Sequence, residues 1–262
     1  MLLDVKLMGL AVAFSLLAVP ASAQTFDHSP FDELLKKHVV KGMVDYESFA
    51  QAGAFKDYLT SLEHADVSKL SDRERLAFWI NAYNAYTIEL INKYEERASI
   101  KNIREGVGFQ RTKGPWKEPI VKAAGKTYSL DEVENAIIRK QFREPRIHFA
   151  LVCAAMSCPP LRSEAYTGAK LDAQLDSQAR AFVLDQARGS LVDAKKAVVH
   201  ASRIFDWFKD DFGGTEAAVG QYIAKYYSDS PEKQLLLSGR FKMEYLDYDW
   251  TLNSRYLARL RP

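Results

Sequence analysis

Hydrophobic and polar residues alternate along most of the chain with the spacing of short amphipathic helices. The strongest pattern lies between Asp72 and Tyr94, where apolar side chains recur every three or four residues, as on one face of a helix. Ser71 precedes this run and Glu74 follows three residues later, which is the capping-box signature of a helix start. The positions on this face are Leu76, Trp79, Ile80, Tyr83, Thr87, Leu90, Ile91 and Tyr94. The pattern predicts one long helix over 72–94.

The other predicted elements are shorter. Ser129 and Glu132 form a second capping box, at the start of a helix expected over 129–142. Two β-prone runs on either side of Ala124-Gly125 predict a hairpin, because a glycine-containing turn between such runs is the usual hairpin signal. Further helices are expected at 31–40, 46–62, 171–184, 203–208 and 217–227, and further strands at 191–193, 197–200 and 241–246. These elements predict an α+β fold of one domain, with a small antiparallel sheet surrounded by several helices.

The stretch 146–162 concentrates the residues that could carry chemistry. It contains both cysteines of the chain, Cys153 and Cys158, and one of its five histidines, His148. The run 147–152 is apolar apart from His148, and we predict that it forms a short buried strand. Cysteine catalysis requires a thiol and an imidazole that removes its proton, so this stretch is the candidate active site.

The residues leave open which cysteine acts. In a straight strand side chains alternate between the two faces, so His148 and Cys153 point in opposite directions. Cys158 follows a turn and is not bound by this alternation, so the parity of the positions favours Cys158 as the nucleophile. Pro159 and Pro160 lack the backbone N–H groups that could bind an oxyanion after Cys158, and this favours Cys153. A disulfide between the two cysteines is the competing structural interpretation. A labile disulfide would join both interpretations, because it would mask the nucleophile until reduction.

Two polar residues on the inner faces of predicted helices complete the candidate site. Glu134 lies on the apolar side of the helix over 129–142, and His148 on the next element is a candidate partner for its carboxylate. The alternative is a carboxylate at the helix edge that reaches water. Asn84 lies on the apolar face of the helix over 72–94, where a buried amide must find hydrogen-bond partners. We expect Asn84 to hold a neighbouring segment in place, with a direct catalytic role as the alternative.

The first residues have the pattern of a secretory signal peptide. Lys6 precedes an apolar run over 7–19, and Ala21-Ser22-Ala23 is a small-residue cleavage site. The apolar run is too short for a membrane span. The sequence therefore predicts a signal peptide over 1–23, a single domain over 24–262, and a periplasmic or secreted protein.

Charge and residue spacing argue against several classes of function. The formal net charge is +2, from 36 basic and 34 acidic residues, and the basic residues are scattered, so we expect no nucleic-acid partner and no membrane-surface partner. The histidines are dispersed and form no metal-binding motif. A Gly-x-Gly in the loop over 106–117 lacks the third glycine of a phosphate-binding motif, and this loop is expected to cover a cleft instead. We expect no metal and no cofactor.

Six short motifs, in order, give the chain a family resemblance. They are Phe78-Trp-Ile-Asn-Ala-Tyr-Asn84, Gly114-Pro-Trp116, Ser129-Leu-Asp-Glu-Val-Glu134, His148-Phe-Ala-Leu-Val-Cys153, Ser157-Cys-Pro-Pro160 and Tyr245-Leu-Asp-Tyr-Asp-Trp250. This combination resembles the family catalogued as domain of unknown function 547, over about 42–253. The resemblance implies a fold similar to papain-like or transglutaminase-like cysteine enzymes. It also implies a triad of Glu134, His148 and one of Cys153 or Cys158.

Two functional hypotheses follow. In the first, the protein is a cysteine-dependent hydrolase or acyl-transferase for an amide or thiol-containing substrate such as a peptide. His148 is then the base, Glu134 its orienter, and Cys153 or Cys158 the nucleophile, with Asn84 in support. In the second, the protein is a non-catalytic periplasmic binding module. A Cys153–Cys158 disulfide then staples a loop beside an aromatic-lined cleft.

Overall fold

The computed structural model describes residues 24–103 and 114–260, and these form an α+β fold, which confirms the predicted class. The predicted signal peptide over 1–23 lies outside the described residues, as does most of the loop predicted over 106–117. The α-helices are α1 (Ser29–His38), α2 (Tyr46–Gln51), α3 (Gly53–Glu63), α4 (Asp72–Lys93), α5 (Arg139–Phe142), α6 (Leu171–Val183), α7 (Arg203–Trp207), α8 (Glu216–Ala224), α9 (Pro231–Ser238) and α10 (Arg255–Leu260). No helix in the described ranges combines the length and the apolarity needed to cross a bilayer.

The strands are divided among three small sheets within the described residues. They are β1 (Val39–Val40), β2 (Met43–Val44), β3 (Pro119–Ala123), β4 (Lys126–Ser129), β5 (Ser190–Asp193), β6 (Val198–Ala201) and β7 (Lys242–Tyr245). The pairs β1–β2, β3–β4 and β5–β6 are antiparallel, whereas β7 joins β6 in parallel. The predicted hairpin is confirmed as β3–β4, and both turn residues, Ala124 and Gly125, have the positive φ that a tight two-residue hairpin turn requires.

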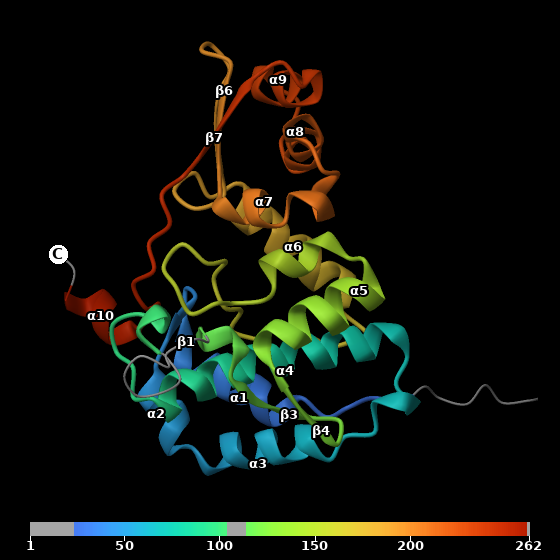
Figure 1. The fold of residues 1–262 in the computed structure, drawn as a ribbon, viewed down its shortest axis with the longest axis vertical. Helices are drawn as coiled ribbons and strands as arrows, with labels where there is room; N and C mark the ends of the chain where they lie inside the picture. The colour runs from blue at the N-terminus through green and yellow to red at the C-terminus, as the bar shows by residue number, and fades with distance from the viewer. Residues whose placement is uncertain (1–23, 104–113, 261–262) are drawn as a thin grey trace, which may run out of the picture.

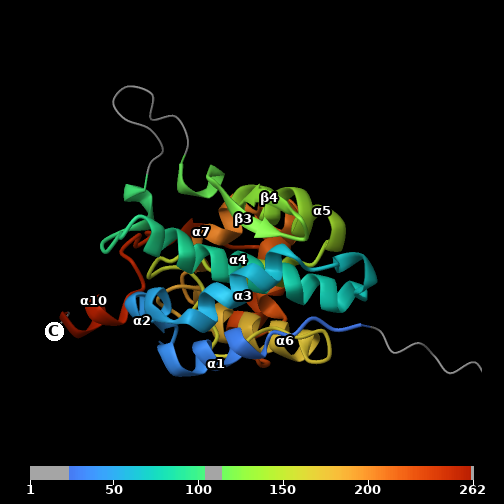
Figure 2. The same ribbon diagram turned by 90° about the horizontal axis from the view of Figure 1, so that it is seen from below.

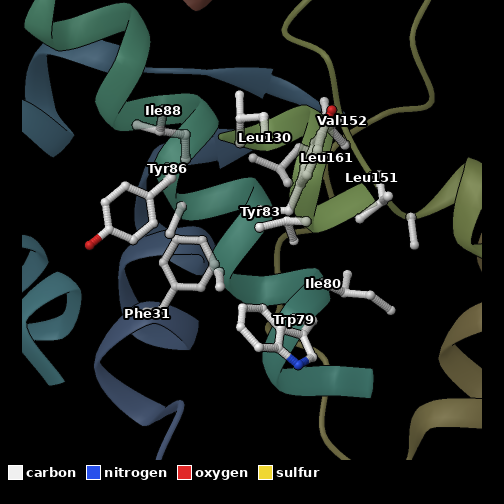
Figure 3. Packing of buried hydrophobic residues seen from close by; sticks show 14 of the residues in the cluster. Phe31, Trp79, Ile80, Tyr83, Tyr86, Ile88, Leu130, Leu151, Val152 and Leu161 are labelled. Carbon is white, nitrogen blue, oxygen red and sulfur yellow. The ribbon is translucent and has the colours of Figure 1, made fainter. Parts of the chain in front are cut away.

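Helix α4 runs through the centre of the larger part of the molecule (Figures 1 and 2). Ser71 caps it as predicted, because its hydroxyl accepts a hydrogen bond from the backbone N–H of Glu74. The predicted apolar stripe is only part of its buried surface, since small residues on its other sides, such as Ala77 and Ala85, are also fully buried. Figure 3 shows Tyr83 of this helix packed among side chains that include Leu151. A helix that is buried on nearly every side is a core helix rather than a surface one.

Buried side chains of the described residues form two hydrophobic clusters. The larger surrounds α4, and the smaller lies between α6 and the C-terminal elements α7, α8 and α9, which occupy the upper end of Figure 1. Phe149 packs in the smaller cluster, although Ile147 and Ala150 beside it pack in the larger one. The segment that carries His148 therefore joins the two clusters.

The strand predicted over 147–152 is wrong. This region begins as a 3₁₀ helix over Pro145–Phe149 and continues as an irregular chain. Pro145 favours a helix start because its fixed φ suits the first turn, and the Glu144 side chain accepts a hydrogen bond from the N–H of Arg146. Short buried apolar runs give the same sequence signal in strands and in helical turns. Because the chain is not a strand here, the parity argument for Cys158 loses its basis.

Side-chain amides of α4, together with backbone hydrogen bonds between residues 154–157 and the segment 249–253, hold the irregular chain after Phe149. Asn84 donates a hydrogen bond to the Ala150 carbonyl and accepts one from the Val152 N–H, both at 2.9 Å. Asn81, one helical turn earlier, makes the same pair of bonds with the backbone of Tyr166. Buried backbone groups need partners. The two asparagines on α4 therefore fix the path of this loop, as expected for Asn84.

Candidate active site

A cleft of about 390 Å³ opens where the two hydrophobic clusters meet. Leu151 contributes to its lining from the larger cluster and Ile204 from the smaller one. The cleft brings together four of the predicted site residues. They are Glu134, His148, Cys153 and Cys158. Asn84 does not line the cleft but holds the chain that leads from His148 to the cysteines.

The two cysteines form a disulfide across a separation of five residues. Cys158 is buried, with 3% of its surface exposed, whereas Cys153 is partly exposed to the cleft. The backbone N–H of Cys153 donates to Sγ of Cys158 at 2.8 Å, and the Tyr248 hydroxyl lies 3.2 Å from Sγ of Cys153. A backbone donor at a sulfur stabilises negative charge there. Cys153 is therefore the accessible sulfur, and Cys158 is placed to leave as a thiolate.

His148 is buried, and a carboxylate holds its ring. Nε2 lies 2.6 Å from Oδ2 of Asp211, and the ring stacks on Phe208 at 3.9 Å between ring centroids. Nδ1 has no hydrogen-bond partner in the described structure, and Oε1 of Glu134 is 3.7 Å away. When Nε2–H donates to Asp211, the neutral ring keeps its lone pair on Nδ1. The residue that holds the ring is thus Asp211, whereas Glu134, predicted as the orienter, lies beyond hydrogen-bond distance.

Asp211 is bound on two sides. Besides His148, Arg139 approaches it in a bidentate pair, with Nε 2.6 Å from Oδ2 and Nη2 3.0 Å from Oδ1. The hydrogen bond from His148, and after it the pair with Arg139, holds the pKa of Asp211 far below its usual range. Asp211 therefore remains ionised throughout the neutral range and can fix the orientation of the ring.

Replacing Asp211 by asparagine is expected to lower the free energy of unfolding by about 1.5–3 kcal/mol at pH 7, the range for hydrogen bonds to a charged group. A carboxyl whose pKa is lowered by folding stabilises the protein above its unfolded value of about 3.9, and this contribution fades as the pH falls. The difference between wild type and Asp211→Asn should therefore be constant above about pH 5 and shrink below about pH 4. Urea unfolding at several pH values measures it. The exposed neighbour Asp210 is the control, since Asp210→Asn should show no such dependence.

The carboxylates of the cleft come from a π-helix and the residue just before it. The helix predicted over 129–142 begins at the predicted capping box, in which Ser129 and Glu132 exchange hydrogen bonds. Residues Glu132–Ile138 then form a π-helix, which continues into α5. Asp131, directly before the π-helix, and Glu134 and Asn135 within it line the cleft together. π-Helical turns occur frequently at functional sites.

Aromatic rings form much of the remaining lining. Trp207 and Tyr248 each contact Trp250, at 5.7 and 4.5 Å between ring centroids, and Trp116 contacts the same ring at 5.7 Å. Trp207 is 46% exposed, so part of this aromatic wall faces solvent. Burial, and after it the charge of Glu134, raises the pKa of the Tyr248 phenol, which therefore stays protonated and can donate a hydrogen bond.

The sequence predicted an aromatic-lined cleft, but it identified neither the rings that form the wall nor Asp211. Asp211 lies 63 residues after His148, and no motif links the two positions. The available signal was an acidic pair, Asp210-Asp211, directly after a run rich in aromatic residues. Trp116 and Trp250 fall within the motifs of the family resemblance, but nothing in their spacing shows that they meet.

Metal binding receives no support from the geometry of residues 24–103 and 114–260. Within these ranges, no group of three or more His, Cys, Asp or Glu side chains is arranged to hold a metal ion. Asp211 instead binds His148 and Arg139, and Glu134 accepts a hydrogen bond from Tyr83.

Comparison with known proteins gives one match. No curated protein matches the chain. No solved structure matches it either. One family model matches residues 67–183, a range that includes α4, the π-helix, His148 and both cysteines. The resemblance noted from the motifs is therefore confirmed for residues 67–183, which match the family described as protein of unknown function, DUF547.

Proposed function

We propose that the protein is a cysteine-dependent acyl-transfer enzyme, a hydrolase or an acyl-transferase, whose nucleophile is Cys153 and whose base is His148. The observation that carries this proposal is the state of the His148 ring. Asp211 fixes it at Nε2, while Nδ1 is free of hydrogen bonds in the cleft that also contains Cys153. A carboxylate, an oriented imidazole and a sulfur in one cleft are the parts that cysteine catalysis needs.

The disulfide is the resting form of this site. A dithiol reductant breaks the S–S bond by supplying two electrons and two protons, so that Cys153 and Cys158 become thiols and the reductant becomes a disulfide. An incoming thiolate meets Cys153 first, because Cys158 is buried. The displaced Cys158 sulfur keeps the backbone N–H of Cys153 as its donor.

In the reduced site, Nδ1 of His148 takes the proton of the Cys153 thiol, and Sγ bonds to the acyl carbon of the substrate. The carbonyl oxygen then carries the negative charge, for which the protonated hydroxyl of Tyr248 is a nearby donor, since it lies 3.2 Å from Sγ. Collapse of this intermediate breaks the bond to the leaving group, which takes the proton from His148. Water or an amine then cleaves the resulting thioester and regenerates the thiol.

Mass spectrometry of the acylated protein tests this proposal. Wild type and the variants Cys158→Ser and Cys153→Ser are incubated with a small activated acyl donor, such as an acyl p-nitrophenyl ester, with and without a dithiol. Cys158→Ser cannot form the disulfide and should gain one acyl group on Cys153 without reductant. Wild type should gain it only after reduction, and Cys153→Ser in neither condition.

Two outcomes would contradict the proposal. The first is acylation of Cys153→Ser as fast as that of Cys158→Ser, because the acyl group would then sit elsewhere. The second is an unmodified Cys153 in every variant and condition, although iodoacetamide alkylates the same thiol after reduction. The alkylation shows that the thiol is reduced and can be reached by a small reagent. Its failure to accept an acyl group would then mean that the thiol does not carry out acyl transfer.

A second candidate function is a non-catalytic binding module, and the oxidised Cys153–Cys158 pair is the observation that favours it. In that case the disulfide fixes the loop below an aromatic cleft. A disulfide that persists in an excess of dithiol while the protein stays folded would support this function over acyl transfer.

A further inference from the structure

The cleft contains two carboxylates that form no ion pair with a lysine or arginine of the described residues. Asp131 and Glu134 line it, and no lysine or arginine of the described residues lines it with them. Asp131 accepts a hydrogen bond from the amide of Asn135, and Glu134 accepts a long one, at 3.5 Å, from the hydroxyl of Tyr83. Asp211, which does not line the cleft, differs from these two carboxylates because Arg139 forms an ion pair with it. Removing a carboxylate even partly from water costs free energy unless a cation pairs with it.

The same cleft contains an acceptor that is buried and without a partner. His148 has a side chain with 0% of its surface exposed, and its Nδ1 has no hydrogen bond in the described structure. This atom lies 3.7 Å from Oε1 of Glu134. A carboxylate oxygen and a buried ring nitrogen thus lie side by side in the lining of the oxidised cleft, and both accept hydrogen bonds when Nε2–H donates to Asp211. A ligand with several N–H donors can satisfy both acceptors.

The aromatic wall suits a cation as well. Trp207, Tyr248 and Trp250 line the cleft with the two carboxylates, and the face of an indole or phenol ring attracts a positive charge. Trp250 already makes one cation–π contact, because Nζ of Lys101 lies 5.1 Å from its ring centroid. Lys101 does not itself line the cleft. Aromatic faces combined with carboxylates form a standard receptor for an alkylammonium group.

From these contacts we propose that the cleft recognises a primary ammonium group on its ligand, such as the side chain of a lysine-type residue in a peptide or amino-acid amide. Glu134 and Asp131 bind the ammonium group, and the rings of Trp207 and Trp250 contact its alkyl chain. As a statement about a substrate, the inference rests on the proposed function, because the ammonium group then positions an acyl group at Cys153. This gives Glu134 a role in binding the ligand, while Asp211 holds His148.

The test measures binding to the oxidised wild-type protein, in which the disulfide blocks acyl transfer. Three probes differ only in side chain: Nα-acetyl-lysine methylamide, its neutral analogue Nα-acetyl-norleucine methylamide, and the acidic Nα-acetyl-glutamate methylamide. Tryptophan fluorescence reports binding, since Trp116, Trp207 and Trp250 line the cleft. The lysine probe should bind at least about tenfold more tightly than the norleucine probe, the equivalent of one charge pair, and its affinity should fall as salt is added.

Variants assign the effect to the two carboxylates. Glu134→Gln and Asp131→Asn should each weaken binding of the lysine probe by about tenfold and leave the norleucine probe unchanged. The matched control is Glu33→Gln, an exposed carboxylate on α1, which should change neither. Circular dichroism confirms that each variant is folded.

Equal binding of the three probes would overturn the inference, as would a preference for the acidic probe or no binding of the lysine probe at millimolar concentration. The proposed function can fail separately. If the lysine probe binds selectively but Cys153 is never acylated, the ammonium site stands and belongs to a binding module. If Cys153 is acylated but the three probes bind equally, acyl transfer stands and the ammonium site does not.

Discussion

Replacing Asn84 by alanine is expected to lower the free energy of unfolding by about 2–6 kcal/mol, because two buried backbone groups lose their partners at about 1–3 kcal/mol each. These groups are the carbonyl of Ala150 and the N–H of Val152, and Asn84 binds both. Urea unfolding followed by circular dichroism measures the loss. The same variant should also slow acylation of Cys153, because the released chain carries that residue.

Asn81→Ala is the matched control for this prediction. Asn81 also lies on α4 and makes the same pair of hydrogen bonds, but with the backbone of Tyr166 rather than with the chain that leads to Cys153. We expect a similar loss of stability and, under conditions in which both variants are folded, a smaller effect on acylation. A stability loss below about 1 kcal/mol for Asn84→Ala would mean that water replaces the lost bonds. Equal effects on acylation would mean that Asn84 has no particular role in the site.

Removing the imidazole of His148 is expected to slow acylation of Cys153 by about 10²–10⁴-fold at pH 7, the usual contribution of a positioned general base. The measurement uses Cys158→Ser as the parent protein, so that reduction of the disulfide does not limit the rate. His148 is buried, so alanine would leave a cavity and destabilise the fold. Glutamine avoids this problem, since its amide can still donate to Asp211 but cannot take a proton.

The expected result is therefore the same rate loss in His148→Gln as in His148→Ala, with stability closer to that of the parent. His64→Gln is the control, since His64 is exposed on the surface and should have no effect. An acylation rate in His148→Gln within about threefold of the parent would show that Cys153 reacts without this base, and the proposed mechanism would be wrong.

Much of the fold could be predicted from local signals. The capping residues Ser71 and Ser129 identified two helix starts, and the hairpin turn at Ala124-Gly125 identified β3–β4, because each signal depends on residues only a few positions apart. The strand predicted over 147–152 failed for the opposite reason. The backbone groups of Ala150 and Val152 are satisfied by Asn84, which lies 66 and 68 positions away. A pattern within the segment contains no information about so distant a partner.

The site residues also divide into those that local sequence signals identify and those that depend on distant contacts. Glu134, His148 and the two cysteines could be identified because their residue types stand out on apolar elements, and the structure places all four in one cleft. Asp211 could not, since its role depends on how the smaller hydrophobic cluster packs against the larger one. The π-helix was also hidden, because its capping box and apolar spacing are those of an ordinary α-helix.

The disulfide is a weak structural crosslink for this chain. It closes a ring of few residues, with a sequence separation of only five, and a loop of that length restricts the unfolded chain by no more than about 2 kcal/mol of free energy. The path of the same loop is already set by backbone hydrogen bonds between residues 154–157 and the segment 249–253, and Asn84 holds the chain just before it. The folded shape therefore hardly depends on the oxidation state of the sulfurs, whereas their reactivity depends on it entirely. If Cys153 is the proposed nucleophile, the redox state of the surroundings would switch its chemistry on or off without any need for the protein to refold.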